Sequence, residues 1–119
     1  MTAPAGVTHG ALKTLLSDGQ ELALIDVREQ GVYFHGHLLF ASCAPLSRLE
    51  TMIADLVPRR SARVVLCDGG EGGLAERAAE KLRGFGYRDV SCLSGGVPGW
   101  RAAGYEIFSG INVPSKAFC

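Results

Sequence analysis

A cysteine that precedes a glycine-rich loop is the feature of this sequence with the clearest chemical potential. Residues 64–66 form an apolar run, residues 67–73 read CDGGEGG, and residues 74–82 carry leucine and alanine at four-residue spacing. The first pattern predicts a buried strand and the last predicts a helix. Cys67 then ends a strand just before a helix N-terminus. Unpaired backbone N–H groups at such a position lower the pKa of a thiol and stabilise the thiolate.

The loop itself has the composition of an anion-binding turn. Its glycines allow positive φ, which turns backbone N–H groups inward, and they leave the approach to the sulfur open. We therefore interpret Cys67 as a nucleophile and the loop as its substrate-binding cradle. The loop residues are Asp68, Gly69, Gly70, Glu71, Gly72 and Gly73. The alternative interpretation is a plain connection after an inert, buried cysteine.

Three other chemistries are disfavoured by spacing. A phosphate-binding P-loop needs Gly-Lys followed by Ser or Thr, and Gly72 and Gly73 are followed by Leu74. A cysteine phosphatase needs an arginine six positions after the nucleophile to hold phosphate, and that position is Gly73. A dinucleotide-binding fingerprint would need a further glycine at Glu76. The chemistry that remains for this loop is a reaction at the sulfur of the cysteine.

The elements that must position Cys67 alternate between strands and helices. Strands are expected over 22–27, 40–44, 64–67, 90–93 and 105–108, and helices after Thr8 and over 29–35, 47–57, 74–83 and 97–103. Ser47 and Glu50 are expected to form a capping box for the third helix. This order predicts parallel strands with helices on both faces, with the site beyond the carboxyl ends of the strands.

Composition narrows the class of protein. The 119 residues fit one domain, and twelve basic and twelve acidic residues give zero net charge, so neither nucleic acid nor a membrane surface is expected as a partner. No membrane span or secretory signal is apparent, which predicts a cytoplasmic protein. The four cysteines lack metal-ligand spacing, so we expect neither a zinc site nor any other metal.

Four segments together resemble the rhodanese homology domain over about residues 7–108. They are Leu24-Ile25-Asp26-Val27-Arg28-Glu29; Tyr33 with Gly36-His37; Val64-Val65-Leu66-Cys67 with Gly70, Ala78-Ala79 and Leu82; and Gly86-Tyr87, Val90, Leu93, Gly95-Gly96 and Trp100. The resemblance implies an α/β, three-layer domain over 1–108, with a central, mostly parallel sheet of about five strands. Residues 109–119 would be an extension or linker, in one domain of a longer tandem protein.

The resemblance also implies a function. Cys67 would take sulfane sulfur from a small donor as a persulfide and pass it to a nucleophilic acceptor, with no cofactor. Asp26, Arg28 and His37 match family positions that we interpret as structural, through an ion pair or hydrogen bond near the end of the sheet.

One departure from the family pattern bears on activity. Active members commonly carry arginine or lysine in this loop, and Gly72 stands where that arginine would be. Asp68 and Glu71 instead add negative charge, which raises a thiol pKa and repels a dianion. We therefore expect weak use of thiosulfate. The alternatives are a catalytically inactive binding or regulatory module and a redox-sensing Cys67, with Cys43, Cys92 or Cys119 as the resolving thiol.

Overall fold

The protein folds around a five-stranded sheet whose strands all run parallel, in the order β1-β5-β4-β2-β3. The computed structural model describes residues 5–38, 41–70 and 73–107. In chain order the elements are β1 (Ala5–Val7), α1 (His9–Leu16), β2 (Leu22–Asp26), α2 (Gln30–His35), β3 (Ser42–Cys43), η1 (Leu46–Arg48, a 3-10 turn), α3 (Leu49–Leu56), β4 (Arg63–Cys67), α4 (Leu74–Gly84), β5 (Val90–Leu93) and α5 (Gly96–Ala102).

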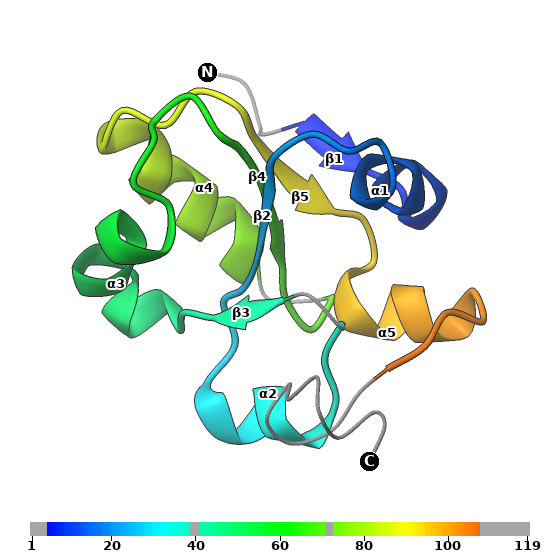
Figure 1. The fold of residues 1–119 in the computed structure, drawn as a ribbon. Coiled ribbons are helices and arrows are strands. Elements are labelled where there is room, and N and C mark those ends of the chain that lie inside the picture. Colours follow the sequence, from blue (N-terminus) through cyan, green and yellow to red (C-terminus); the bar gives the residue numbers. More distant parts are fainter. Residues whose placement is uncertain (1–4, 39–40, 71–72, 108–119) are drawn as a thin grey trace, which may run out of the picture.

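Helices cover both faces of the sheet, as the alternating pattern predicts (Figure 1). On one face α3 and α4 pack against side chains such as Ile25, Val64 and Leu66. On the other face α1 and α5 pack against Leu24 and Val65, which alternate with those side chains along the same strands. The central strands β2 and β4 are therefore buried on both sides, and this explains their continuous apolar runs.

The fifth strand is not the expected one. Residues 105–107 form no strand, and Phe108 lies outside the described residues, so the prediction of an edge strand there is wrong over its described part. The edge is formed instead by β1, whose residue Val7 pairs with Leu93 of β5. Three residues, Ala5–Val7, carry too short a pattern to be recognised in the sequence.

The capping box predicted at Ser47 is also absent. Ser47 lies inside the 3-10 turn, and α3 begins at Leu49 after Arg48, with no side-chain cap. The Ser47 hydroxyl donates instead to a carboxylate oxygen of Glu29, at 3.4 Å. Thr8 does cap α1, because its hydroxyl accepts from the amide of Ala11 at 3.1 Å.

Among the helices of the described ranges, none combines the length and the apolar composition that a transmembrane span requires.

Candidate functional site

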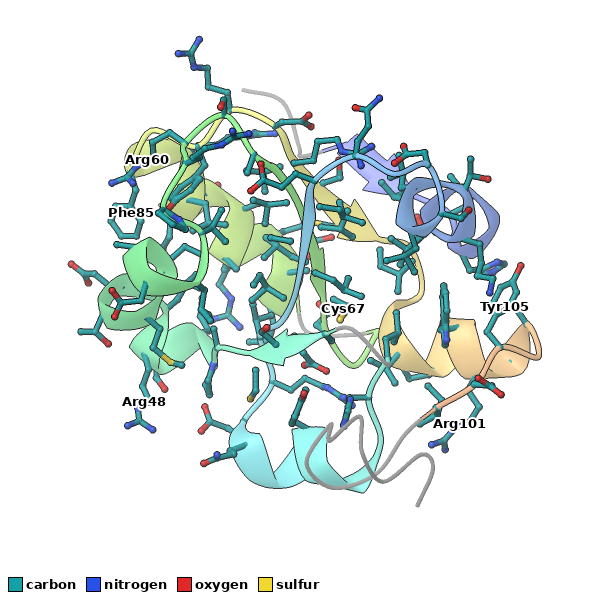
Figure 2. All side chains as sticks on the ribbon, viewed as in Figure 1. Arg48, Arg60, Cys67, Phe85, Arg101 and Tyr105 are labelled. Atoms are coloured by element: carbon teal, nitrogen blue, oxygen red, sulfur yellow. The ribbon has the colours of Figure 1, made fainter. Side chains whose placement is uncertain are left out.

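Cys67 is the last residue of β4, at the carboxyl edge of the sheet (Figure 2). It lies beside Asp26 of β2 in the register, and its carbonyl accepts from the amide of Val27 at 3.0 Å. These contacts hold the carboxyl end of β4 against β2. The Cys67 side chain has no exposed surface and packs on the α1 and α5 face. The thiol is at the edge where the sequence places it, but it is closed to solvent.

Burial raises the pKa of the Cys67 thiol well above its ordinary value, and the carboxylates of Asp26 and Asp68 raise it further. The Arg28 guanidinium acts in the opposite direction without cancelling these effects. This direction is opposite to the one expected from a helix N-terminus alone. Burial thus favours the neutral thiol over the thiolate.

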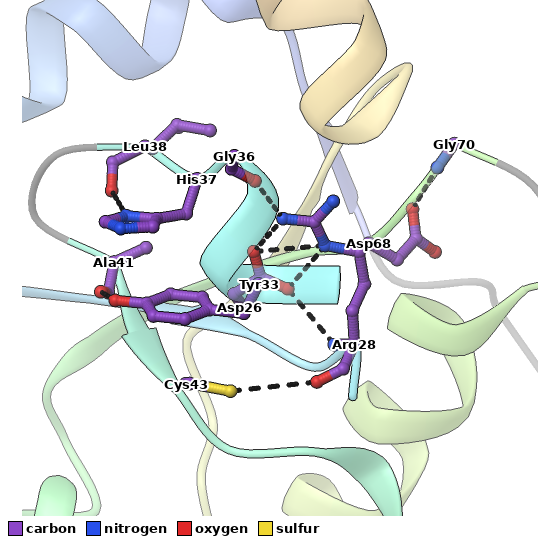
Figure 3. Close-up of polar contacts among 10 residues, drawn as sticks. All are labelled: Asp26, Arg28, Tyr33, Gly36, His37, Leu38, Ala41, Cys43, Asp68 and Gly70. Carbon is purple, nitrogen blue, oxygen red and sulfur yellow. Dashed lines mark hydrogen bonds and ion pairs between the residues drawn. The ribbon is translucent and has the colours of Figure 1, made fainter. Parts of the chain in front are cut away.

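The Asp68 carboxylate takes two of the backbone donors that lie between β4 and α4. It accepts from the amide of Gly70 at 2.8 Å (Figure 3). It also accepts from the amide of Ala75, in the first turn of α4, at 2.9 Å. Gly73, at the N-cap of α4, offers no side-chain acceptor. The anion at this helix N-terminus is thus the protein's own carboxylate. The sequence signal was available, because aspartate two residues before glycine is typical of a turn in which the side chain accepts from the backbone.

A second glycine turn, between β5 and α5, packs directly on the loop after Cys67. The amide of Val97 donates to the carbonyl of Asp68 at 2.9 Å. A Cβ on Gly96, where φ is +59°, would lie 2.4 Å from that carbonyl oxygen, and one on Gly70, where φ is +85°, would lie 2.7 Å from the carbonyl of Gly95. Both backbones therefore need glycine to approach this closely. Glu71 and Gly72 lie outside the described residues.

Asp26 and Arg28 form a buried ion pair beside the thiol. Nε and Nη2 of Arg28 donate to the two Asp26 oxygens at 2.9 and 2.7 Å, and Nη2 also donates to the carbonyl of Gly36 at 2.6 Å (Figure 3). This is the ion pair that the resemblance implied near the end of the sheet. The Arg28 guanidinium of this pair is also the nearest positive charge to the site among the described residues. The sequence analysis had looked for such a charge within the loop.

His37 stabilises the segment after α2. It is fully buried, stacks on Tyr33 with ring centroids 4.1 Å apart, and donates from Nδ1 to the carbonyl of Leu38 at 2.8 Å. The Tyr33 hydroxyl donates to the carbonyl of Ala41 at 2.6 Å. These contacts give His37 a structural role.

The other cysteines are poorly placed to resolve an oxidised Cys67. Cys43 is level with Cys67 in the sheet register but lies two strands away, because Asp26 of β2 is between them. Two strand spacings are about 9.6 Å, beyond the roughly 7 Å that a disulfide tolerates between Cα atoms. The Cys92 side chain lies on the opposite face of the sheet from Cys67. In the register Cys92 pairs with Leu66, and both side chains belong to the core on the α3 and α4 face. Cys119 lies outside the described residues.

Two pockets flank the loop. One, of about 190 Å³, lies on the β5 side and is lined by Asp68, Glu76 and Cys92. The other, of about 360 Å³, lies between α2 and α5 and is lined by Arg28 and Arg101 among apolar groups. In the described parts of the chain, no group of three or more His, Cys, Asp or Glu side chains is arranged to hold a metal ion.

Comparison with known proteins matches residues 8–103 to the family model described as the rhodanese-like domain. A crystal structure of thiosulfate sulfurtransferase from Pseudomonas aeruginosa is 49% identical, with a TM-score of 0.89, over 96% of this chain and 22% of that one. The Alr3790 protein of Anabaena sp. is 27% identical, with a TM-score of 0.78, over 94% of this chain and 98% of that one.

Two curated relatives carry names from different functional classes, a transcriptional regulator and an enzyme. An HTH-type transcriptional regulator, Rv0324 of Mycobacterium tuberculosis, is 33% identical over 93 residues, which are 78% of this chain and 40% of that protein. Thiosulfate sulfurtransferase of Gallus gallus is 36% identical over an alignment of 74 residues, and the match covers 57% of this chain and 26% of that protein. The chain therefore spans less than half the length of either relative.

Proposed function

Because this chain belongs to the rhodanese-like domain family, we propose that it is a sulfurtransferase that carries sulfane sulfur as a persulfide on Cys67. The observation that carries the proposal is the place of this thiol. Cys67 ends a central strand at the carboxyl edge, beside the Arg28 guanidinium and before the loop that leads into α4. Relatives named thiosulfate sulfurtransferase support the same reaction class.

The proposed reaction has two displacement steps. The Cys67 thiolate attacks the outer sulfur of thiosulfate, so that a Cys67 S–S bond forms and sulfite leaves with the electron pair of the broken bond. A nucleophilic acceptor then attacks the outer sulfur of the persulfide, and the Cys67 thiolate leaves. The net charge and the number of electrons are unchanged in each step, so the protein needs no redox partner.

The site as built is poorly suited to a dianionic donor. Cys67 is buried and its pKa is raised, and Asp68 already occupies two of the donors that would stabilise an incoming anion. Groups packed around Cys67 must therefore move before a donor contacts the sulfur. We expect slow use of thiosulfate and better use of donors with less negative charge.

A second candidate function follows from the same closed site. A thiol with no exposed surface and a raised pKa is typical of an inert cysteine, and one relative is named as a transcriptional regulator. A rhodanese-like module that binds or regulates without catalysis is therefore the alternative.

Intact mass spectrometry separates the two. The protein is incubated with thiosulfate, with mercaptopyruvate and with a low-molecular-weight persulfide, alongside an active sulfurtransferase. The first proposal predicts a gain of about 32 Da, one sulfur atom, in the wild type and in Cys92→Ser, and no gain in Cys67→Ser. If no donor modifies Cys67 while the active control gains sulfur, the chain is not a sulfur carrier and the binding module is favoured.

A further inference from the structure

The strand β2 is paired along its whole length on one side but along only part of it on the other. On one side β4 pairs with every residue of β2. On the other side β3 pairs only with Ile25 and Asp26, beginning at Ser42, so it lies beside the carboxyl end of β2 (Figure 1). In the described part of the chain, no strand pairs with residues 22–24 on this side, which we call the β2 edge.

Backbone groups of two leucines face the β2 edge. The carbonyl of Asp26 faces this side, where it accepts from the amide of Ala44 at 2.9 Å. Successive residues of a strand direct their N–H and C=O groups to opposite sides, so Leu22 and Leu24 direct theirs to the same side as Asp26. The N–H of Leu24 and both backbone groups of Leu22 therefore have no strand partner among the described residues.

A pocket of about 220 Å³ lies along the β2 edge. It is lined by residues 21–25, by Ser42 at the start of β3, and by Leu56 and Val57 at the end of α3. Within the described ranges only two large hydrophobic side chains are exposed, Val32 and Leu56, and Leu56 stands at this pocket with 37% of its surface exposed. The β2 edge thus joins unpaired backbone groups to an uncovered aliphatic side chain.

The charges beside this pocket are already paired. Arg59 donates to the carboxylate of Glu21, and Arg63 donates to both oxygens of Asp18 at 2.9 and 3.1 Å. These four side chains add no net charge, so they attract neither an anion nor a cation selectively. The occupant that complements the β2 edge is therefore uncharged and supplies backbone acceptors and donors, as an extended peptide does.

The strand β3 limits which peptide can enter. If the β2 edges of two copies of this chain paired about a two-fold axis, Leu22 of one copy would lie level with Leu24 of the other. Glu21 would then lie level with Ile25 of the other copy, where Ser42 already pairs. A second copy of this chain therefore meets β3, whereas a short separate segment can end or turn before Ser42.

We infer that the β2 edge is a docking site for an extended, uncharged peptide segment of another protein, which adds a short parallel strand. A peptide residue level with Ala23 accepts from the N–H of Leu24 and donates to the carbonyl of Leu22. Its side chain lies on the same face of the sheet as Ala23, which packs on the α3 and α4 core, and so meets Leu56. This interaction does not depend on the chemistry proposed for Cys67.

The test is an NMR titration of the whole chain with the capped peptide Ac-Thr-Val-Thr-Val-NH2. We expect saturable shifts at the amides of Leu22 and Leu24 and at the Leu56 methyl groups. The same peptide with N-methyl groups on its two central residues cannot donate from the centre of either edge, so it should bind about tenfold more weakly. Leu56→Ser should weaken binding about fivefold. Val32→Ser, the matched change at the other exposed aliphatic side chain, should leave binding unchanged.

Four results would overturn this inference. The first is an absence of saturable shifts at Leu22 and Leu24. The second is equal binding of the N-methylated peptide, because backbone pairing would then not be what is recognised. The third is binding that tightens more than about tenfold when lysine or glutamate replaces the valines, which would indicate a site for charge. The fourth is the same amide shifts on concentrating the protein alone, together with a dimer in sedimentation velocity, which would assign the β2 edge to a second copy.

Discussion

Replacing Asp68 with Asn should make Cys67 more acidic and more reactive. The Asp68 carboxylate accepts from the amides of Gly70 and Ala75 at 2.8 and 2.9 Å, and its charge raises the pKa of the Cys67 thiol. Asn removes that charge. It also keeps only one oxygen acceptor, so one backbone N–H is released at the N-terminus of α4. Both changes favour a thiolate in place of the lost anion.

The magnitude follows from the position of the charge. Two charges on adjacent residues, several ångströms apart at an effective dielectric constant of about 20 to 40, interact by about 1 to 3 kcal/mol. Burial and Asp26 raise the Cys67 pKa more than Asp68 does, so the effect of removing the Asp68 charge should fall at the low end of that range. The same loss of repulsion should speed persulfide formation from thiosulfate by about fivefold.

The assay is alkylation by iodoacetamide, a neutral reagent, as a function of pH. Site-resolved mass spectrometry separates Cys67 from the other cysteines. Asp55→Asn, an equivalent change on the exposed face of α3, is the control. The midpoint for Cys67 should fall by about one unit in Asp68→Asn alone. An unchanged or raised midpoint would refute the view that Asp68 occupies the anion site.

Two further predictions concern stability. Gly96→Ala should lower the free energy of unfolding by more than about 2 kcal/mol in urea titrations, because a Cβ there meets backbone at 2.4 Å, whereas Gly104→Ala, also at positive φ but in open space, should cost only about 1 kcal/mol. Similar losses in the two variants would contradict the close packing at Gly96. Burial raises the pKa of Cys92 to about 11 from an ordinary 9.0, so the neutral thiol stabilises the fold below pH 9 and this contribution is lost between pH 9 and 11. Cys92→Ala should show a shallower fall of unfolding free energy than wild type across that window, and an equal fall would count against the buried neutral thiol.

Much of the architecture was predictable because it depends on local patterns. The apolar runs over 22–27 and 64–67 are typical of strands covered on both faces, and the leucine and alanine spacing after Gly73 is typical of a helix that faces a core. The place of Cys67 at the carboxyl edge followed, since parallel strands end together. The Asp26 and Arg28 pair was expected only through the family resemblance, whose positions these two residues match, and the structure shows it as an ion pair.

What the sequence could not decide depends on contacts between segments that are far apart in the chain. Asp68 was interpreted as a charge that repels the substrate, and only the fold shows that it accepts from the start of α4. Arg101 is 65 residues from Gly36, and only the packing of α5 against the segment after α2 brings it to the pocket wall. The sequence by itself therefore determined the strand, the thiol and the glycine loop, through side-chain periodicity and backbone freedom. The tertiary structure decided which charges face that thiol, because electrostatic effects depend on distance in space and on burial.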